Sequence, residues 1–78
     1  MPPAAEVIVR LITAAMAESG LPVVALAPDT NILRDTGLDS MALAVLVVQL
    51  EEELGKDPFA EGFINFRTIG ELAALYER

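Results

Sequence analysis

The sequence contains no cysteine and no histidine. The first absence excludes disulfides and thiolate nucleophiles, and the two together exclude most zinc and iron sites. Histidine is also the usual general base near neutral pH. An enzyme built from this chain would depend on carboxylates, Lys, Arg or the single tyrosine, Tyr76. The composition therefore favours a binding or carrier role over catalysis.

Basic residues are few: the chain has five Lys and Arg and 12 Asp and Glu, which gives a formal net charge of −7. Nucleic-acid binding requires a basic surface, so we expect no nucleic-acid partner. An acidic surface favours partners with basic surfaces. At 54% hydrophobic residues, the chain is too apolar for a disordered acidic tail, so we expect it to fold.

Long hydrophobic runs are also missing. No run reaches the roughly 18 apolar residues needed to span a bilayer. Residues 4–16 are fairly apolar, but Glu6 and Arg10 interrupt them, and Pro2 and Pro3 stand where a signal peptide would be basic. We therefore expect a cytoplasmic protein with no membrane association.

Apolar residues recur at spacings of three and four in three segments, which predicts helices over Ala4–Ser19, Ser40–Leu54 and Thr68–Tyr76. Thr68 and Glu71 have the spacing of a capping box. We expect residues 21–39 to form a long connection, with turn chemistry at 29–31 and a short strand around Val23–Leu26 as one option. A single helical turn is expected around Phe59–Phe63, with side chains that plug the core: Phe59, Phe63, Ile64 and Phe66.

These elements predict an all-α fold. We expect a small four-helix bundle, with three main helices, one short helix and a long loop between helices one and two. A chain of 78 residues is enough for a single domain, residues 1–78. Because Met1 opens the chain and no linker follows Arg78, we expect a stand-alone protein, and we expect it to be a monomer.

The most informative stretch is Gly37-Leu38-Asp39-Ser40-Met41. It places a serine between a long loop and the first turn of an amphipathic helix. Asp39 is a good helix N-cap, so one interpretation is that Asp39 and Ser40 only start the helix. That short pattern by itself is unspecific.

The stretch resembles the attachment motif of acyl and peptidyl carrier proteins, in which Asp-Ser-Leu or Asp-Ser-Met follows a Gly-hydrophobic pair. The resemblance covers residues 29–76. It continues in the approach to the serine, in the end of the following helix and in the start of the last helix: Asp29…Leu33…Asp35-Thr36-Gly37, Gln49-Leu50-Glu51-Glu52-Glu53-Leu54-Gly55 and Arg67-Thr68-Ile69.

The resemblance implies that Ser40 carries a covalent 4′-phosphopantetheine arm taken from coenzyme A, with Asp39, Leu38 and Met41 beside it. The chain would then hold acyl, aminoacyl or polyketide intermediates as thioesters. Its implied partners are a phosphopantetheinyl transferase, an acyl- or aminoacyl-loading enzyme and downstream synthase enzymes. The resemblance also implies that Asp39 assists the transferase, near its magnesium ion.

Ser40 is not an activated nucleophile in this sequence, because no His or Lys accompanies it in the motif. The base must come from the modifying enzyme, and the thiol must come from the cofactor. Both requirements suit a passive carrier, so we expect no enzymatic activity and no metal site of its own.

The helix after Ser40 has a second apolar stripe, formed by Met41, Val45 and Val48 and followed by Glu52. It lies about 160–200° around the helix from the predicted core side chains. Partners of the resembled family dock on this helix. In that family, the carriers of fatty-acid synthesis have acidic residues at the positions that Val45 and Val48 occupy here. The valines therefore imply docking that is more hydrophobic than electrostatic, as in a dedicated carrier of polyketide or nonribosomal peptide biosynthesis.

Two alternatives stay open at this point. In one, Val45 and Val48 are buried by the loop or by neighbouring helices. In the other, the chain is a small interaction module that binds a partner through Met41–Val48, and Asp39-Ser40 is only a cap. The many alanines permit close helix packing, which we favour, or a slim channel for the cargo: Ala14, Ala15, Ala42, Ala44, Ala73 and Ala74.

Overall fold

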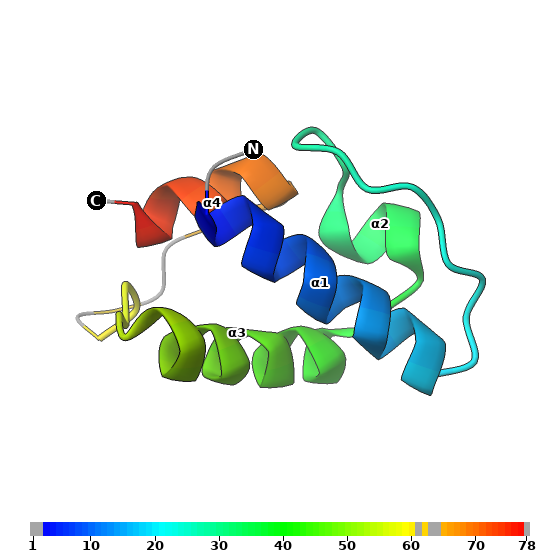
Figure 1. Cartoon of the computed structure of the whole chain (residues 1–78), viewed down its shortest axis with the longest axis horizontal. Helices are drawn as coiled ribbons and strands as arrows, with labels where there is room; N and C mark the ends of the chain where they lie inside the picture. The colour runs from blue at the N-terminus through cyan, green and yellow to red at the C-terminus, as the bar shows by residue number, and fades with distance from the viewer. Residues whose placement is uncertain (1–2, 61, 63–64, 78) are drawn as a thin grey trace.

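The computed structural model describes residues 3–60, 62 and 65–77, and this part of the chain is helical (Figure 1). It contains α1 (Pro3–Glu18), α2 (Ile32–Thr36), α3 (Ser40–Leu54) and α4 (Ile69–Tyr76). Helix α1 crosses the front of the molecule and packs against both α3 and α4. The predicted all-α bundle of three main helices and one short helix, with a long loop after the first, is confirmed.

The core lies where α1, α3 and α4 meet. Helix α1 contributes three fully buried side chains at intervals of four residues, Ile8, Ile12 and Met16, because residues four apart stack on one face of a helix. The other helices and the loop complete the cluster with buried side chains: Ile32, Leu38, Leu46, Leu50, Ile69, Leu72 and Tyr76. Each large side chain buried in this way stabilises the fold by about 1.5–3 kcal/mol relative to exposure.

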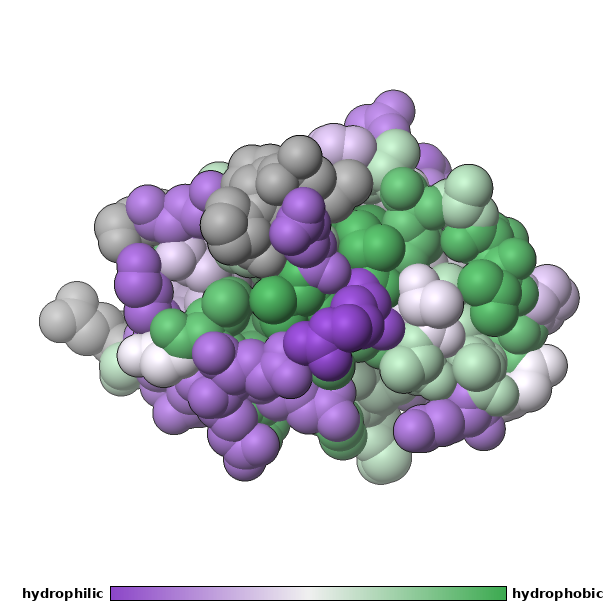
Figure 2. All heavy atoms as spheres, in the orientation of Figure 1, coloured by the Kyte–Doolittle hydropathy of each residue, from purple (hydrophilic) through white to green (hydrophobic). Residues whose placement is uncertain are grey.

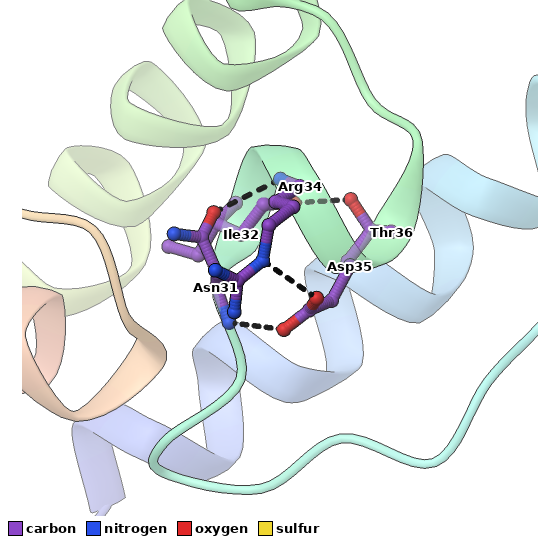
Figure 3. A network of polar contacts seen from close by, with 5 residues as sticks. All are labelled: Asn31, Ile32, Arg34, Asp35 and Thr36. Atoms are coloured by element: carbon purple, nitrogen blue, oxygen red, sulfur yellow. Dashed lines mark hydrogen bonds and ion pairs between the residues drawn. The ribbon is translucent and has the colours of Figure 1, made fainter.

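The short helix lies at a different place from the one expected. It is α2, inside the long connection, whereas residues 58–60 form only a turn. Phe63 and Ile64, which were also expected there, lie outside the described residues. Asn31 caps α2 by accepting the Arg34 amide on Oδ1 at 2.9 Å. Asp35 closes the turn by accepting the Asn31 amide at 2.8 Å (Figure 3). The turn chemistry was visible in the sequence, but the helix that it starts was not.

The loop before α2 is attached to the start of α4 through its backbone. The Ile69 amide donates to Thr30 at 3.1 Å, and the Gly70 amide donates to Pro28 at 2.8 Å. A Cβ at Gly70 would lie 3.0 Å from the Pro28 carbonyl oxygen, so any larger residue would push the two backbones apart by a few tenths of an ångström. Residues 21–27 are irregular, and no strand forms there. The one bridge found among the described residues pairs Asn31 with Thr68.

Figure 2 shows how polar and hydrophobic side chains are distributed over one face of the molecule. Polar side chains dominate the lower left, towards the end of α3, and hydrophobic side chains gather on the right, over the loop that follows α1. Val23 and Val24 of that loop are both exposed. None of the described helices has the length and apolar character needed to cross a membrane.

Helix α4 begins with the predicted capping box, which is confirmed. Thr68 Oγ1 accepts the Glu71 amide at 3.1 Å, and Glu71 Oε1 accepts the Thr68 amide at 3.0 Å. The hydrogen bonds from Thr68 and Arg67 hold the pKa of the exposed Glu71 carboxyl below its ordinary value of 4.5. The charged form of Glu71 therefore stabilises the start of α4, which in turn holds the loop.

This arrangement predicts a pH-dependent difference in stability between the wild type and Glu71→Gln. A carboxyl with a lowered pKa stabilises the fold fully above its unfolded pKa and loses that contribution as the pH falls through the folded pKa. The wild-type advantage should thus be complete above pH 4.5 and should shrink below it. Urea unfolding of both proteins at several pH values measures this difference in the free energy of unfolding. Asp35, whose pKa is also lowered, is present in both proteins and cancels; a pH-independent difference would contradict the prediction.

Candidate functional site

The first turn of α3 presents Ser40 at the surface. Asp39 is the N-cap, and its Oδ1 accepts the Ala42 amide at 2.8 Å. The Asp39 carbonyl accepts the Leu43 amide at 3.1 Å. Ser40 is the first helical residue, and its side chain is exposed. The predicted cap is therefore formed, and the hydroxyl next to it is accessible.

The backbone before Asp39 is fixed by two buried residues, Thr36 and Leu38, each only 5% exposed. The Thr36 hydroxyl donates to the Ile32 carbonyl (Figure 3) and accepts the Leu38 amide at 3.2 Å. Between them, Gly37 has a φ of 81° and ends α2, a conformation that favours glycine. Leu38 thus contributes to the site as an anchor in the core.

Sequence reasoning missed Thr36. Its burial follows from the short helix α2, which turns the side chain inward and gives the hydroxyl two backbone partners. The signal in the sequence was a small polar residue directly before a glycine that ends a helix, but it is weak without knowledge of that helix. A buried hydroxyl with both hydrogen bonds made holds a loop more firmly than an apolar residue would.

The second apolar stripe faces away from the core. Met41 is 76% exposed, and Val45 and Val48 are each 54% exposed. Glu52, which follows them, is exposed as well. Neither the loop nor a neighbouring helix covers the two valines, which excludes the alternative that they are buried. An exposed row of large apolar side chains on one helix is typical of an interaction surface.

A groove opens beside Ser40, on the flank of α3. Its volume is about 410 Å³, and its lining is almost entirely apolar: Ser40, Leu43, Ala44, Val47, Asp57, Phe59 and Phe66. The rings of Phe59 and Phe66 lie 5.8 Å apart and tilted. Both rings were expected in the core, and they pack only partly against it. Their other sides form a wall of the groove.

A second, smaller groove of about 220 Å³ lies between α1 and α3. Three alanines are among its lining residues, and Val45 belongs to both this groove and the exposed stripe. The lining consists of Leu11, Ala14, Ala15, Glu18, Ser19, Ala42, Val45 and Gln49. Of the alanines named in the sequence, Ala73 is buried, while Ala14, Ala15, Ala42 and Ala44 border surface grooves.

The site has the features of an anchoring point. Across the described ranges, no group of three or more acidic residues is placed to hold a metal ion. The positive end of the α3 dipole lies at Ser40, where it would stabilise a phosphodiester. An accessible hydroxyl with an apolar groove next to it fits a long, flexible group attached through phosphate.

Curated relatives resemble this chain over 47 residues, which is 60% of its length. The chain is 43% identical to the acyl carrier protein MbtL of Mycolicibacterium paratuberculosis and 45% identical to those of Mycobacterium bovis and Mycobacterium tuberculosis. The matched stretch spans little more than half of these relatives, 53% to 56%. No solved structure matches the chain at a comparable level of significance.

The family comparison covers more of the chain. The model described as "Phosphopantetheine attachment site" matches residues 9–76, which includes α2, α3, α4 and the segment that holds Ser40. Members of this family carry a 4′-phosphopantetheine group and are carriers, not enzymes. With an accessible serine at the start of α3 and a groove beside it, the chain belongs to the family of phosphopantetheine attachment domains.

Proposed function

We propose that this chain holds acyl, aminoacyl or polyketide intermediates as thioesters on a 4′-phosphopantetheine arm at Ser40. It delivers them to partner enzymes of polyketide or nonribosomal peptide biosynthesis in the cytoplasm. One observation carries the proposal: Ser40 is the exposed first residue of α3, directly after the Asp39 cap and the buried anchor Leu38. The name of the matched relatives, acyl carrier protein, supports the acyl class of cargo.

Attachment of the arm needs chemistry from outside the chain. The transferase removes the proton from Ser40 Oγ, which then forms a bond to the phosphorus of coenzyme A that carries the pantetheine. The bond from that phosphorus to the adenosine bisphosphate breaks, and adenosine 3′,5′-bisphosphate leaves. When bound, the arm supplies the thiol that a chain without cysteine cannot supply.

The residues around Ser40 have distinct roles in this proposal. Leu38 fixes the backbone from within the core, as its burial indicates. Asp39 caps α3 with Oδ1, and its charge also assists the transferase, near the magnesium ion. Met41 extends from the same turn with its side chain exposed, so it is placed to contact the arm or the partner that receives it.

Partner enzymes dock on the exposed stripe of Met41, Val45 and Val48, with Glu52 at its end. The first ten residues of α3 carry no charge, although half of that helix faces solvent. A helix that is apolar all round is normally buried, so this surface is suited to being covered by another protein. The apolar character of the stripe is the reason for assigning the chain to a dedicated biosynthetic pathway.

The carrier role predicts modification at Ser40 and nowhere else. Incubation with coenzyme A and a broad-specificity phosphopantetheinyl transferase should add the mass of one phosphopantetheinyl group, measured by intact-protein mass spectrometry. Ser40→Ala should abolish the gain. Ser19→Ala removes the chain's other serine, which is exposed at the end of α1, and should leave the gain intact. No gain with several transferases would refute the carrier role.

If the charge of Asp39 assists the transferase, Asp39→Asn should slow the transfer of phosphopantetheine to Ser40 without lowering the stability of the fold. Asparagine caps helices as well as aspartate does, so the free energy of unfolding should change little. A lost hydrogen bond or metal contact to a charged group lowers the kcat/KM of the transferase by roughly tenfold or more. Asp39→Ala should lower both quantities. If Asp39→Asn is modified as fast as the wild type, Asp39 is a cap and nothing more.

The docking surface predicts that Val45→Glu and Val48→Glu each lower the kcat/KM of the loading enzyme. The loss should be roughly tenfold, because a carboxylate would be buried unpaired in the docked complex. Glutamate favours helix more than valine does, so the fold should hold by circular dichroism. Ala74→Glu, at an exposed position of α4, is the matched control. Loading at the wild-type rate by both valine variants would rule out docking on this stripe.

A further inference from the structure

We propose that Met41 is a modification site, and that oxidation of its thioether to the sulfoxide reversibly slows the enzymes that act on Ser40. The inference rests on the proposed function, since it needs enzymes that dock beside Ser40. It adds a form of regulation, in which a peroxide as oxidant and a thiol-dependent sulfoxide reductase set how fast the carrier is loaded.

The chain offers an oxidant few targets. It contains neither cysteine nor tryptophan, so its three methionines are the side chains that hydrogen peroxide oxidises most readily. Two of them lie within the described residues. Met41 is 76% exposed, the highest value among the large apolar side chains described, whereas Met16 is 0% exposed in the core. Since peroxide must reach the sulfur, it should oxidise Met41 and spare Met16.

The oxidation is a two-electron transfer of oxygen. The Met41 sulfur attacks one oxygen of hydrogen peroxide, so that an S–O bond forms and the O–O bond breaks. The leaving hydroxide takes the proton from the new S–O–H group, which gives water and the sulfoxide. Methionine sulfoxide reductases reverse the change: a dithiol supplies two electrons and becomes a disulfide, and the oxygen leaves as water.

Met41 lies where an enzyme that acts on Ser40 must come close. It follows Ser40 in the first turn of α3 and begins the exposed stripe that continues through Val45 and Val48. The first ten residues of α3 carry no charge, so this end of the helix favours an apolar partner surface. A sulfoxide is polar, and burying it without a hydrogen-bond donor opposes docking.

The same change should leave the fold intact. The Met41 side chain is not part of the buried core cluster, so its sulfoxide remains in water when no partner is bound. Oxidation of Met16 would instead place a polar group among fully buried side chains such as Ile12 and Leu50. The two methionines therefore separate an effect on docking from an effect on stability.

Tryptic peptides report the methionines separately. Arg10 and Arg34 divide the three along the chain, and the peptide 35–56 carries both Ser40 and Met41. The protein without its arm is treated with hydrogen peroxide until half of Met41 has gained one oxygen, and catalase then removes the peroxide. By mass spectrometry, peptide 35–56 should be oxidised roughly tenfold faster than peptide 11–34. In urea, where both sulfurs are exposed, the two rates should be similar.

The half-oxidised sample then competes with itself for a limiting amount of a broad-specificity phosphopantetheinyl transferase with coenzyme A. The arm-bearing fractions of peptide 35–56 with and without the added oxygen give the ratio of the two kcat/KM values. The sulfoxide should be loaded roughly tenfold more slowly. Methionine sulfoxide reductases with dithiothreitol, applied before loading, should restore the rate, and circular dichroism should show the same fold throughout.

Two variants locate the effect at one sulfur. Met41→Leu has no thioether beside Ser40, so its peroxide-treated and untreated forms should be loaded at the same rate as each other. Met16→Leu, at the buried position, should keep the full loss after treatment.

The outcomes distinguish the inference from the function beneath it. If the untreated protein gains no arm at Ser40, the carrier function fails and the inference fails with it. Three results would overturn the role of Met41 and leave the carrier function standing: equal oxidation of Met41 and Met16 in the folded protein, equal loading of the two forms of peptide 35–56, or a loss of the same size in peroxide-treated Met41→Leu.

Discussion

The site depends on the burial of Leu38 two residues before Ser40. A chain that leaves a loop and enters a helix can point its first helical side chain in many directions, and ordering each residue costs about 1–2 kcal/mol of backbone entropy. Here a buried leucine, a buried Thr36 hydroxyl with two backbone partners and the Asp39 cap offset that cost. Ser40 lies at the surface because Thr36 and Leu38 are buried and fix the backbone that leads to it.

Helix α3 must satisfy two demands at once. Leu46 and Leu50 face α1 and complete the core, while Met41, Val45 and Val48 on the far side remain in solvent. A domain this small has too few elements to cover both sides, since the buried fraction of the surface falls with size. The exposed side is a cost to the isolated chain and a resource for binding, which is the combination expected of a protein that works only through partners.

Periodicity and caps predicted most of the fold. The three long helices, the Asp39 cap and the capping box at Thr68 are local features, and they appear as expected. Helix α2 could not be predicted in the same way, because five residues are too few for a periodic pattern and its stability comes from Asn31, Asp35 and the buried Ile32. Ser40 was found from its motif, whereas the groove depends on Phe59 and Phe66, which approach α3 only in the folded chain.

The absence of cysteine and histidine has a chemical consequence for a carrier. In the proposed function, a thiol or an imidazole on this chain would react with the thioester that the arm carries. The surface near Ser40 offers hydrocarbon, aromatic rings and carboxylates instead, and of these only the carboxylates interact strongly with charge. In the proposed function, a cargo near Ser40 therefore meets neither a thiol nor an imidazole of this chain.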